Sequence, residues 1–386
     1  MKSSCLGNIL LMSGALFAQD QIEVVKPGDK ISIALPPLGG TTGNDATSIL
    51  TRDLERSGWF RVAASGGDYS IHGSASTSAV QCSVFKKDGA PAVKTNGSGN
   101  LRSAVHQVAD AIVEKIAGKK GIAQTHIAFI SDKTGKKELY VMDYDGFNIK
   151  RFTSDHHIVG SPRFSHQGNR IAYTSYRSGY PDVYVADFPG GGRRVISSHP
   201  GLNSGASFSP NGSRIALTLS KDGNPELYTM LSGGGDLRRL TRTRGGESSP
   251  SWSPDGSQIA YASDQGGRPQ IYIISGSGGG GIQLTTSPAY NTEPDWSAES
   301  GLIAYSSLVG GGFAVSVINP KGGGGRVLYS NGKCEDPSWA PDGRHLVFTR
   351  TEGGSSDLYV LDTLTREAIP LSRSFGNCTE PAWSGR

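Results

Sequence analysis

An aromatic residue followed by a turn recurs along most of this chain at a nearly constant spacing. The aromatic residues are separated by 44, 44, 44, 43 and 44 positions, and they are Phe164, Phe208, Trp252, Trp296, Trp339 and Trp383. Two other patterns keep the same step: an Ile-Ala-aromatic run, as at residues 171–173, and a hydrophobic-Tyr pair, as at residues 183–184. Three patterns locked to one period predict a repeat architecture, and repeats of about 40 to 45 residues are typical of propeller blades.

Each repeat has the composition of four short strands. The run Ser253-Pro254-Asp255-Gly256 fits a tight turn, because Pro presets φ, Asp bonds locally and Gly tolerates the exit. Between such turns lie runs rich in Ile, Val, Tyr and Thr, which favour strands. Four antiparallel strands in 44 residues cannot bury both faces alone, so the repeats are expected to stack around an axis as blades.

The two ends of the repeat region complement each other. The Ile-Ala-aromatic run appears one period before the first aromatic landmark, at residues 127–129, and Trp383 has only three residues after it. We therefore expect the strand from Cys378 to Ser384 to be the innermost strand of the blade formed by residues 125–153. The prediction is a mainly β fold, a six-bladed propeller over residues 125–386 whose ring is closed by its N- and C-terminal strands, which removes exposed edges.

Residues 19–120 are long enough for one small α+β domain before the propeller. Strands are expected at residues 31–35, 60–63, 69–74 and 80–85. Asn44-Asp45 can cap a helix that ends at Gly58. A second helix is predicted over residues 101–117, where apolar residues recur at steps of 3 and 4, and Gly118 ends it.

The first 18 residues have the pattern of a secretory signal, with Lys2, an apolar stretch up to Ala18 and then polar residues. No later segment has the roughly 18 apolar residues that a membrane-spanning helix needs. Removal of the signal would leave Cys82, Cys334 and Cys378, and a disulfide between the last two is left open. The net charge of +4 is nearly balanced, so the composition does not indicate a nucleic-acid partner.

The 54 glycines are about twice the usual share for 386 residues. Most of the excess lies in runs at residues 190–192, 233–235, 278–281 and 322–325, which recur about once per repeat. Each run is predicted to form the hairpin turn between the third and fourth strands of a blade, where positive φ is needed.

Motifs for catalysis or for a cofactor are not found in the sequence. There is no G-x-S-x-G nucleophile elbow, no phosphate loop with Lys-Ser/Thr, and no C-x-x-C. A pair of carboxylates for glycoside hydrolysis, or an axial metal site, could still form from the acidic residues near the axis. We therefore expect no enzyme, no cofactor and no metal, and keep a propeller-based periplasmic hydrolase or a glycan-binding protein as the alternative.

Three segments together resemble the TolB family, the periplasmic propeller proteins of the Tol-Pal system of Gram-negative envelopes. They are LRSAVHQVADAIVEKIAGKKGIAQTHIAFIS, SPSWSPDGSQIAYASDQGGRPQIY and SGWFR. The resemblance implies a monomeric, non-enzymatic scaffold in the periplasm that supports outer-membrane integrity, cell division and protein import. It also implies two partners: the peptidoglycan-associated lipoprotein Pal, bound by one propeller face, and TolA, bound by the mature N-terminal segment. That segment corresponds to Gln21, Ile22, Glu23, Val24 and Val25.

The candidate Pal face is where the first strands of the blades meet the axis, because each repeat contributes one loop to that rim. The residues just before the Pro of each first strand are the candidates: Ser161, Leu202, Asn203, Gly205, Glu247, Ser248, Ser249, Thr292, Glu293, Asp336 and Glu380. In the family an Asn-Thr-Glu-Pro stretch precedes the blade that contains the SDQ-x-GRPQ pattern. Here Glu-Ser-Ser-Pro stands at that place, at residues 247–250, and Asn-Thr-Glu-Pro lies one blade later.

Overall fold

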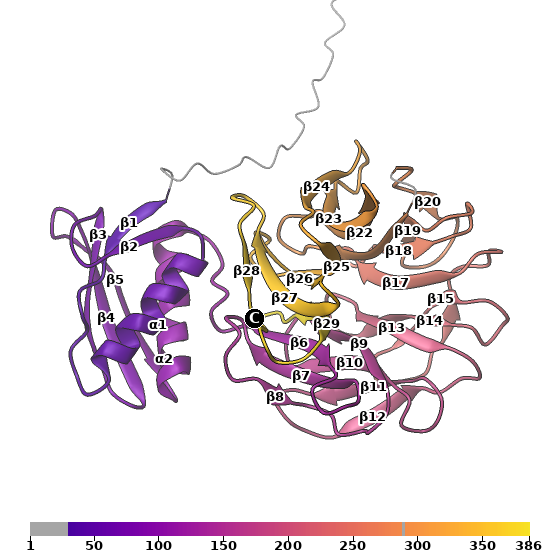
Figure 1. Ribbon diagram of the computed structural model, residues 1–386, viewed down its shortest axis with the longest axis horizontal. Coiled ribbons are helices and arrows are strands. Elements are labelled where there is room, and N and C mark those ends of the chain that lie inside the picture. The colour runs from indigo at the N-terminus through magenta and orange to yellow at the C-terminus, as the bar shows by residue number, and fades with distance from the viewer. Residues whose placement is uncertain (1–29, 288–289) are drawn as a thin grey trace, which may run out of the picture.

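The computed structural model describes residues 30–287 and 290–386, which form two domains joined by a short linker (Figure 1). The predicted signal, residues 1–18, and the segment Gln21 to Val25 lie outside the described residues. No helix within the described ranges is long and apolar enough to cross a membrane.

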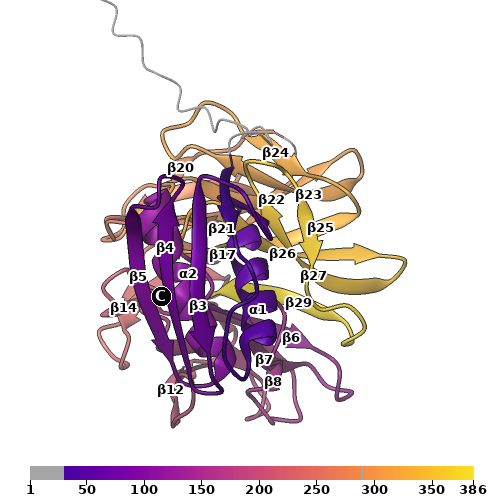
Figure 2. The ribbon, with the colours of Figure 1, turned by 90° about the vertical axis from the view of Figure 1, so that its left-hand side faces the viewer.

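The N-terminal domain is a five-stranded sheet with both of its α-helices on the side nearer the propeller (Figures 1 and 2). Its strand order is β2-β1-β3-β4-β5, in which β1 is parallel to β2 and β3 and the other pairs are antiparallel. The elements are β1 (Ile31–Ala34), α1 (Gly43–Arg56), β2 (Phe60–Ala63), β3 (Tyr69–Ala75), β4 (Ala79–Lys86), β5 (Pro91–Ser98) and α2 (Leu101–Ile112), followed by the π-helix η2 (Val113–Ala117).

Three details of this domain differ from the sequence-based expectation. The predicted cap at Asn44-Asp45 is wrong, because α1 begins at Gly43, where a Cβ would lie 1.9 Å from the carbonyl oxygen of Leu38. Strand β5 was not predicted, since its sequence PAVKTNGS lacks an apolar alternation. The second helix runs to the expected end, with Gly118 left-handed, but its last turn is a π-helix.

Six four-stranded sheets form the propeller, as predicted. Five of them use consecutive strands: β9 (Val159–Phe164), β10 (Arg170–Ser175), β11 (Asp182–Asp187) and β12 (Arg193–Ser197); β13 (Asn203–Phe208), β14 (Arg214–Leu219), β15 (Glu226–Leu231) and β16 (Arg238–Arg239); β17 (Glu247–Trp252), β18 (Gln258–Ser263), β19 (Gln270–Ser275) and β20 (Ile282–Gln283); β21 (Asn291–Trp296), β22 (Ile303–Val309), β23 (Gly312–Ile318) and β24 (Arg326–Tyr329); β25 (Lys333–Trp339), β26 (His345–Glu352), β27 (Ser355–Asp362) and β28 (Ala368–Pro370).

The sixth sheet closes the ring. It combines β6 (His126–Ser131), β7 (Glu138–Asp143) and β8 (Lys150–Arg151) with β29 (Cys378–Trp383), in the order β29-β6-β7-β8. Strand β29 is antiparallel to β6, with Trp383 opposite Ile127 and Cys378 opposite Ser131. Figure 1 shows the yellow C-terminal strand beside the first propeller strands, which confirms the predicted closure.

The aromatic residue of each repeat is buried between neighbouring blades. Trp252, Trp296, Trp339 and Trp383 are 5 to 8% exposed, and each ends the innermost strand of its blade. The glycine runs lie between the third and fourth strands, as expected, and three of the four runs contain residues at positive φ. The Cys82, Cys334 and Cys378 thiols are buried and free, so no disulfide links the last two.

Candidate partner-binding site

Six residues, one from each blade, share a left-handed backbone conformation at one end of the propeller axis. We call them the axial ring: Ser161, Gly205, Ser249, Glu293, Asp336 and Glu380, with φ of 52, 62, 53, 54, 53 and 52°. L-residues rarely adopt such φ values, which cost roughly 1 to 2 kcal/mol each. A strained conformation repeated at the same position of every blade is a built feature of the fold.

The sequence placed these residues in loops, and that detail is wrong. The axial ring lies inside the innermost strands, at a point where the register with the second strand shifts in every blade. In five blades the next residue is Pro, which has no N–H to donate to the ladder, so the strand bulges there. The bulge turns the side chain of each ring residue out of the regular alternation.

The axial ring surrounds a cavity of about 340 Å³, to which all six ring residues contribute. The other residues that line it are Lys137, Arg163, Pro250, Glu335 and Thr379. The ring is chemically uneven, because Glu293, Asp336 and Glu380 are consecutive around it while Ser161, Gly205 and Ser249 form the other half. One half is therefore acidic and the other half is neutral.

Two of these carboxylates connect neighbouring blades. Glu380 Oε2 accepts a hydrogen bond from the backbone N–H of Ser161 at 2.6 Å. Glu293 Oε2 accepts from the N–H of Asp336 at 3.0 Å and from the Ser306 hydroxyl at 2.6 Å. The acidic half of the ring therefore stabilises the blade junctions.

Asp336 differs from the other two acids. Burial, and then repulsion from Glu293 and Glu380, raises the pKa of Asp336 well above its usual range. The Thr349 hydroxyl lies 3.4 Å from Asp336 Oδ2 and accepts a hydrogen bond from the N–H of Glu380 at 3.2 Å. A cationic group from a partner would lower the cost of ionising this cluster.

The remaining candidates from the sequence flank the axial ring, with different exposure. Ser248 is exposed, and Leu202 and Thr292 are half-buried, so these three accompany the ring on the same surface. Asn203 and Glu247 are 0% exposed. Their side chains are not available to a partner in this conformation and instead hold loops, as described below for Glu247.

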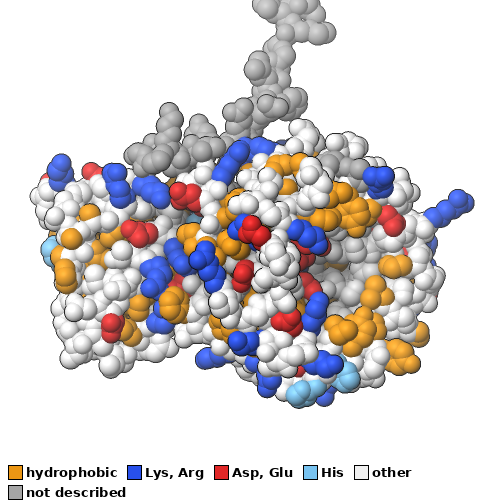
Figure 3. Space-filling view, in the orientation of Figure 1, with side chains coloured by type: hydrophobic (Ala, Val, Ile, Leu, Met, Phe, Trp, Pro, Cys, Tyr) orange, Lys and Arg blue, Asp and Glu red, His pale blue; other side chains and the backbone are white. Residues whose placement is uncertain are grey.

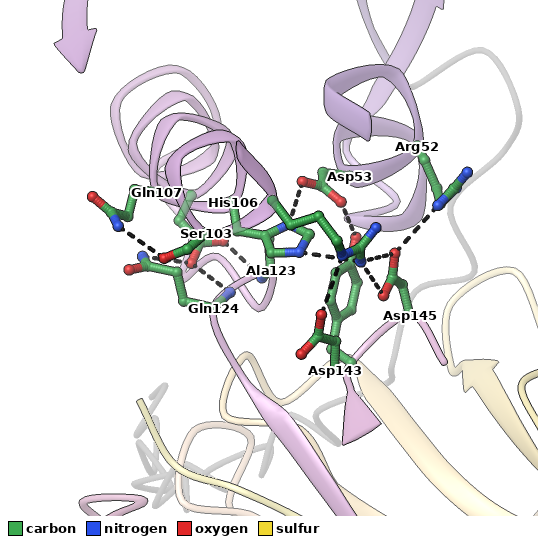
Figure 4. Close-up of polar contacts among 12 residues, drawn as sticks. Arg52, Asp53, Ser103, His106, Gln107, Ala123, Gln124, Asp143 and Asp145 are labelled. Carbon is green, nitrogen blue, oxygen red and sulfur yellow. Dashed lines mark hydrogen bonds and ion pairs between the residues drawn. The ribbon is translucent and has the colours of Figure 1, made fainter. Parts of the chain in front are cut away.

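A second polar cluster, which sequence reasoning missed, joins the two domains (Figure 4). The Arg102 guanidinium of α2 donates to both oxygens of Asp145 at 2.7 and 2.8 Å and to Asp143 at 3.2 Å. His106 Nδ1 lies 2.7 Å from Asp53 Oδ2, and the Tyr144 hydroxyl donates to Asp53 Oδ1 at 2.7 Å. Nothing in the local sequence signals this cluster, because its members come from α1, α2 and the β7–β8 turn.

We call this second cluster the interdomain cluster: Asp53, Arg102, His106, Asp143, Tyr144 and Asp145. It contains the one group of ligand-type side chains close enough for a metal ion among the described residues: His106, Asp143 and Asp145. The Arg102 guanidinium already contacts all three, lying 3.3 Å from His106 Nε2. A second cation would be repelled there, so the arrangement fits an ion-pair network and does not fit a metal centre.

The ion pairs extend along the seam between the domains. Figure 3 shows Lys and Arg side chains gathered there on the face turned to the viewer. Lys120 of the linker pairs with Glu299 at 2.7 Å, and the Arg344 guanidinium lies 4.3 Å from the centroid of the Trp59 ring. These contacts fix the N-terminal domain against the propeller.

The fold and the axial ring define the class of protein: a six-bladed β-propeller joined to a small α/β domain, with a polar surface at one end of its axis. A family model described as the TolB beta propeller domain matches residues 113–386, and the chain belongs to this family.

Individual relatives carry the same family name. The chain is 36% identical over 163 residues to the Tol-Pal system protein TolB of Geobacter sulfurreducens, covering 41% of this chain and 38% of that protein. It is 30% identical over 201 residues to the Tol-Pal system protein TolB of Nitrosomonas europaea, covering 43% and 47%. These matches therefore span less than half the length of the curated relatives.

The crystal structure of TolB from Acinetobacter baumannii is similar over almost its whole length. It superposes with a TM-score of 0.83 at 27% identity, covering 92% of this chain and 97% of that one. The similarity therefore includes both domains.

Proposed function

We propose that this protein is a periplasmic scaffold of the Tol-Pal envelope system. In this role it binds the lipoprotein Pal through the axial ring and its flanking residues, and TolA through the segment Gln21 to Val25. It thereby supports outer-membrane integrity and cell division. Family membership supports the assignment to the Tol-Pal system. The axial ring supports the assignment of the Pal-binding surface, because every blade contributes one residue to it.

The charge of the axial ring indicates what kind of partner surface fits it. Three carboxyl groups lie on one half of the ring, and Glu335, Lys137 and Arg163 line the same cavity. A complementary partner would place basic side chains over Glu293, Asp336 and Glu380 and neutral groups over the serine half. Such pairing raises the association rate and makes it fall with added salt.

The hydrolase alternative has less support from the same geometry. Glycoside hydrolysis needs one carboxylate free to act on water or on the sugar and another poised to donate a proton. Glu293 and Glu380 instead accept backbone hydrogen bonds from neighbouring blades. These two carboxylates are therefore engaged in holding the ring.

Chemical cross-linking in intact envelopes, followed by purification and identification of the attached proteins, tests the proposal. We expect Pal and TolA to be recovered with the full chain, and Pal alone when residues 19–29 are deleted behind an intact signal. Loss of both partners on this deletion would contradict the assignment of two separate sites. Recovery of neither partner with the full chain would contradict the proposed function itself.

A further inference from the structure

Two buried glutamates lie beside each other at the start of the strand that carries Ser249 of the axial ring. Glu226 begins β15 and Glu247 begins β17, the strand that carries Ser248 and Ser249, and both glutamates are 0% exposed. The two carboxyl groups are close enough to hydrogen-bond to one another. A hydrogen bond between two carboxyl groups requires that one of them carries a proton.

The Oε1 atom of each carboxyl group accepts two hydrogen bonds. Glu226 Oε1 accepts from the Thr243 N–H and from Arg239, both at 2.9 Å. Glu247 Oε1 accepts from the Ser263 hydroxyl at 2.7 Å and from the Thr243 hydroxyl at 2.8 Å. The pair thus holds residue 243, at the middle of the loop that leads into β17, from two sides.

The second oxygen of each carboxyl group has no donor among the described residues. Both Oε2 atoms are buried, and neither receives a hydrogen bond from any of the groups that surround them. A single proton shared between the two Oε2 atoms would satisfy both. Without it, two negative charges would face each other in a site that water does not reach.

The corresponding positions of the next blade show how a neutral pair occupies this geometry. There Gln270 replaces Glu226 and Asn291 replaces Glu247, and the Asn291 amide donates to Gln270 Oε1 at 2.8 Å. Thr285, which corresponds to Thr241, donates its hydroxyl to the same oxygen at 2.7 Å. At the other blades the residue corresponding to Glu247 is Val159, Asn203, Cys334 or Cys378, so Glu247 is the acidic exception.

We propose that the Glu226–Glu247 pair is a proton-operated latch that holds the loop of residues 241–247, and with it Ser249 of the axial ring, in place. With the shared proton present, the loop is fixed and Ser248 and Ser249 keep their positions. Loss of the proton forces the two carboxylates apart and releases the loop. The effect on partner binding rests on the proposed function; the latch itself does not.

The electrostatics of the pair support a switch near neutral pH. Burial, and then the hydrogen bond with Glu226, raises the pKa of Glu247 to about 7. Although burial opposes it, the nearby Thr241 hydroxyl, Glu247 and the Thr243 N–H lower the pKa of Glu226. The proton of the pair therefore belongs mainly to Glu247.

The other charged or titratable groups around the pair do not replace that proton. Arg239 is the nearest cation, and it also lies 3.6 Å from Asp222 in the neighbouring turn. Asp264 accepts the Gly246 N–H and contributes negative charge. Burial, and then Glu247, raises the pKa of Tyr261, which stays neutral. The remaining groups of these elements are Tyr228, whose hydroxyl bonds to Asp222, and the exposed Arg242 and Arg244 of the loop itself.

Hydrogen exchange of the full chain at pH 6 and pH 8 tests the latch, with Glu247→Gln as the matched variant. The glutamine keeps the acceptor for Thr243 and Ser263 and donates its amide to Glu226, as Asn291 does to Gln270. After correction for intrinsic exchange, we expect opening of residues 241–247 to rise about tenfold between these pH values in the unchanged protein, since pH 8 lies one unit above the pKa. We expect no such rise in the variant. Glu226→Gln, which also leaves one carboxyl group, should behave like Glu247→Gln.

An equal pH response in the unchanged protein and both variants would overturn the latch.

The consequence for the axial ring is measured by calorimetry with the soluble domain of Pal. Its affinity should fall up to about tenfold from pH 6 to pH 8 for the unchanged protein and stay constant for Glu247→Gln. Exchange that follows the prediction while Pal binds equally at both pH values would overturn the link to the ring. Absence of Pal binding at both pH values would contradict the proposed function, and the exchange ratio would still decide the latch.

Discussion

Trp383 is the side chain on which closure of the propeller depends most, and Trp383→Ala tests that role. Trp383 is 6% exposed, and its indole N–H donates to the Thr125 hydroxyl at 2.7 Å. Its backbone N–H donates to the Ser338 hydroxyl of the adjacent blade at 3.1 Å. The side chain therefore connects the last strand to the start of the propeller, and the backbone connects it to the neighbouring blade.

The expected loss can be worked from these contacts. Replacing a buried Trp by Ala costs about 3 to 5 kcal/mol through lost burial and the remaining cavity. The hydrogen bond to Thr125 adds about 1 kcal/mol. We expect the free energy of unfolding to fall by about 4 to 6 kcal/mol, measured by urea denaturation followed by circular dichroism. The variant should also lose hydrogen-exchange protection in β6, because β29 can detach from it.

Trp296→Ala is the matched control, because Trp296 has the same place in its blade, is 8% exposed and donates its indole N–H to Gly301 O at 3.0 Å. Its strand β21 is tethered by the chain on both sides, so we expect a comparable loss of stability and no selective exposure of β6. A loss below about 1 kcal/mol for Trp383→Ala, or equal β6 exchange in the two variants, would refute the reasoning.

Deletion of residues 376–386 should lower stability more than Trp383→Ala does, since it leaves β6 as an open edge. A deletion variant that melts like the full chain would contradict ring closure.

Three further predictions concern the axial ring, the interdomain cluster and the thiols. Ser249→Gly should raise the free energy of unfolding by up to about 1 kcal/mol, because glycine accepts a φ of 53° without strain. Ser248→Gly should lower the free energy of unfolding, and thermal melting compares the two variants. Although burial opposes the charge, the hydrogen bond with Asp53 raises the pKa of His106. This contact therefore stabilises the packing of α2 against α1 below the unfolded pKa, and its contribution is lost as pH rises through the folded pKa. His106→Gln should remove that dependence from a pH series of melting temperatures. The three cysteines of the described part should react with a thiol reagent only after denaturation, because all are buried, and reaction in the native state would contradict their placement.

The architecture could be predicted because the same four-strand pattern recurs several times along the sequence. A 44-residue period, the turn chemistry and the complementary ends together specify six blades and the pairing of β29 with β6. Strand β5 escaped prediction because a strand at the edge of a sheet needs no alternation of apolar residues. The cap of α1 was misplaced because the close approach of Gly43 to Leu38 is a tertiary contact, which local propensity does not contain.

The sequence grouped the six residues of the axial ring but did not predict their conformation. The step of 44 residues identified all six members of the axial ring, but their left-handed conformation accompanies a bulge against the second strand, which becomes visible only when the strands are paired. The burial of Asn203 and Glu247 was not predicted either, because polar residues before a strand are usually exposed. The interdomain cluster joins residues as far apart as Asp53 and Tyr144, and one sequence carries no signal for such pairs.

The central claim is that the axial ring binds Pal, and calorimetric titration of the soluble domain of Pal into the Glu293→Lys, Ser249→Arg double variant tests it most directly. Asp187→Lys, a charge reversal at an exposed residue at the opposite end of its blade, is the control. We predict that the double variant loses at least about a hundredfold in affinity while the control binds like the unchanged protein. The double variant should melt somewhat lower than the other two, because Glu293 no longer accepts hydrogen bonds from Asp336 and Ser306, but it should remain folded at the temperature of the titration. Equal affinity for the double variant and the unchanged protein would contradict the claim and place the Pal site elsewhere.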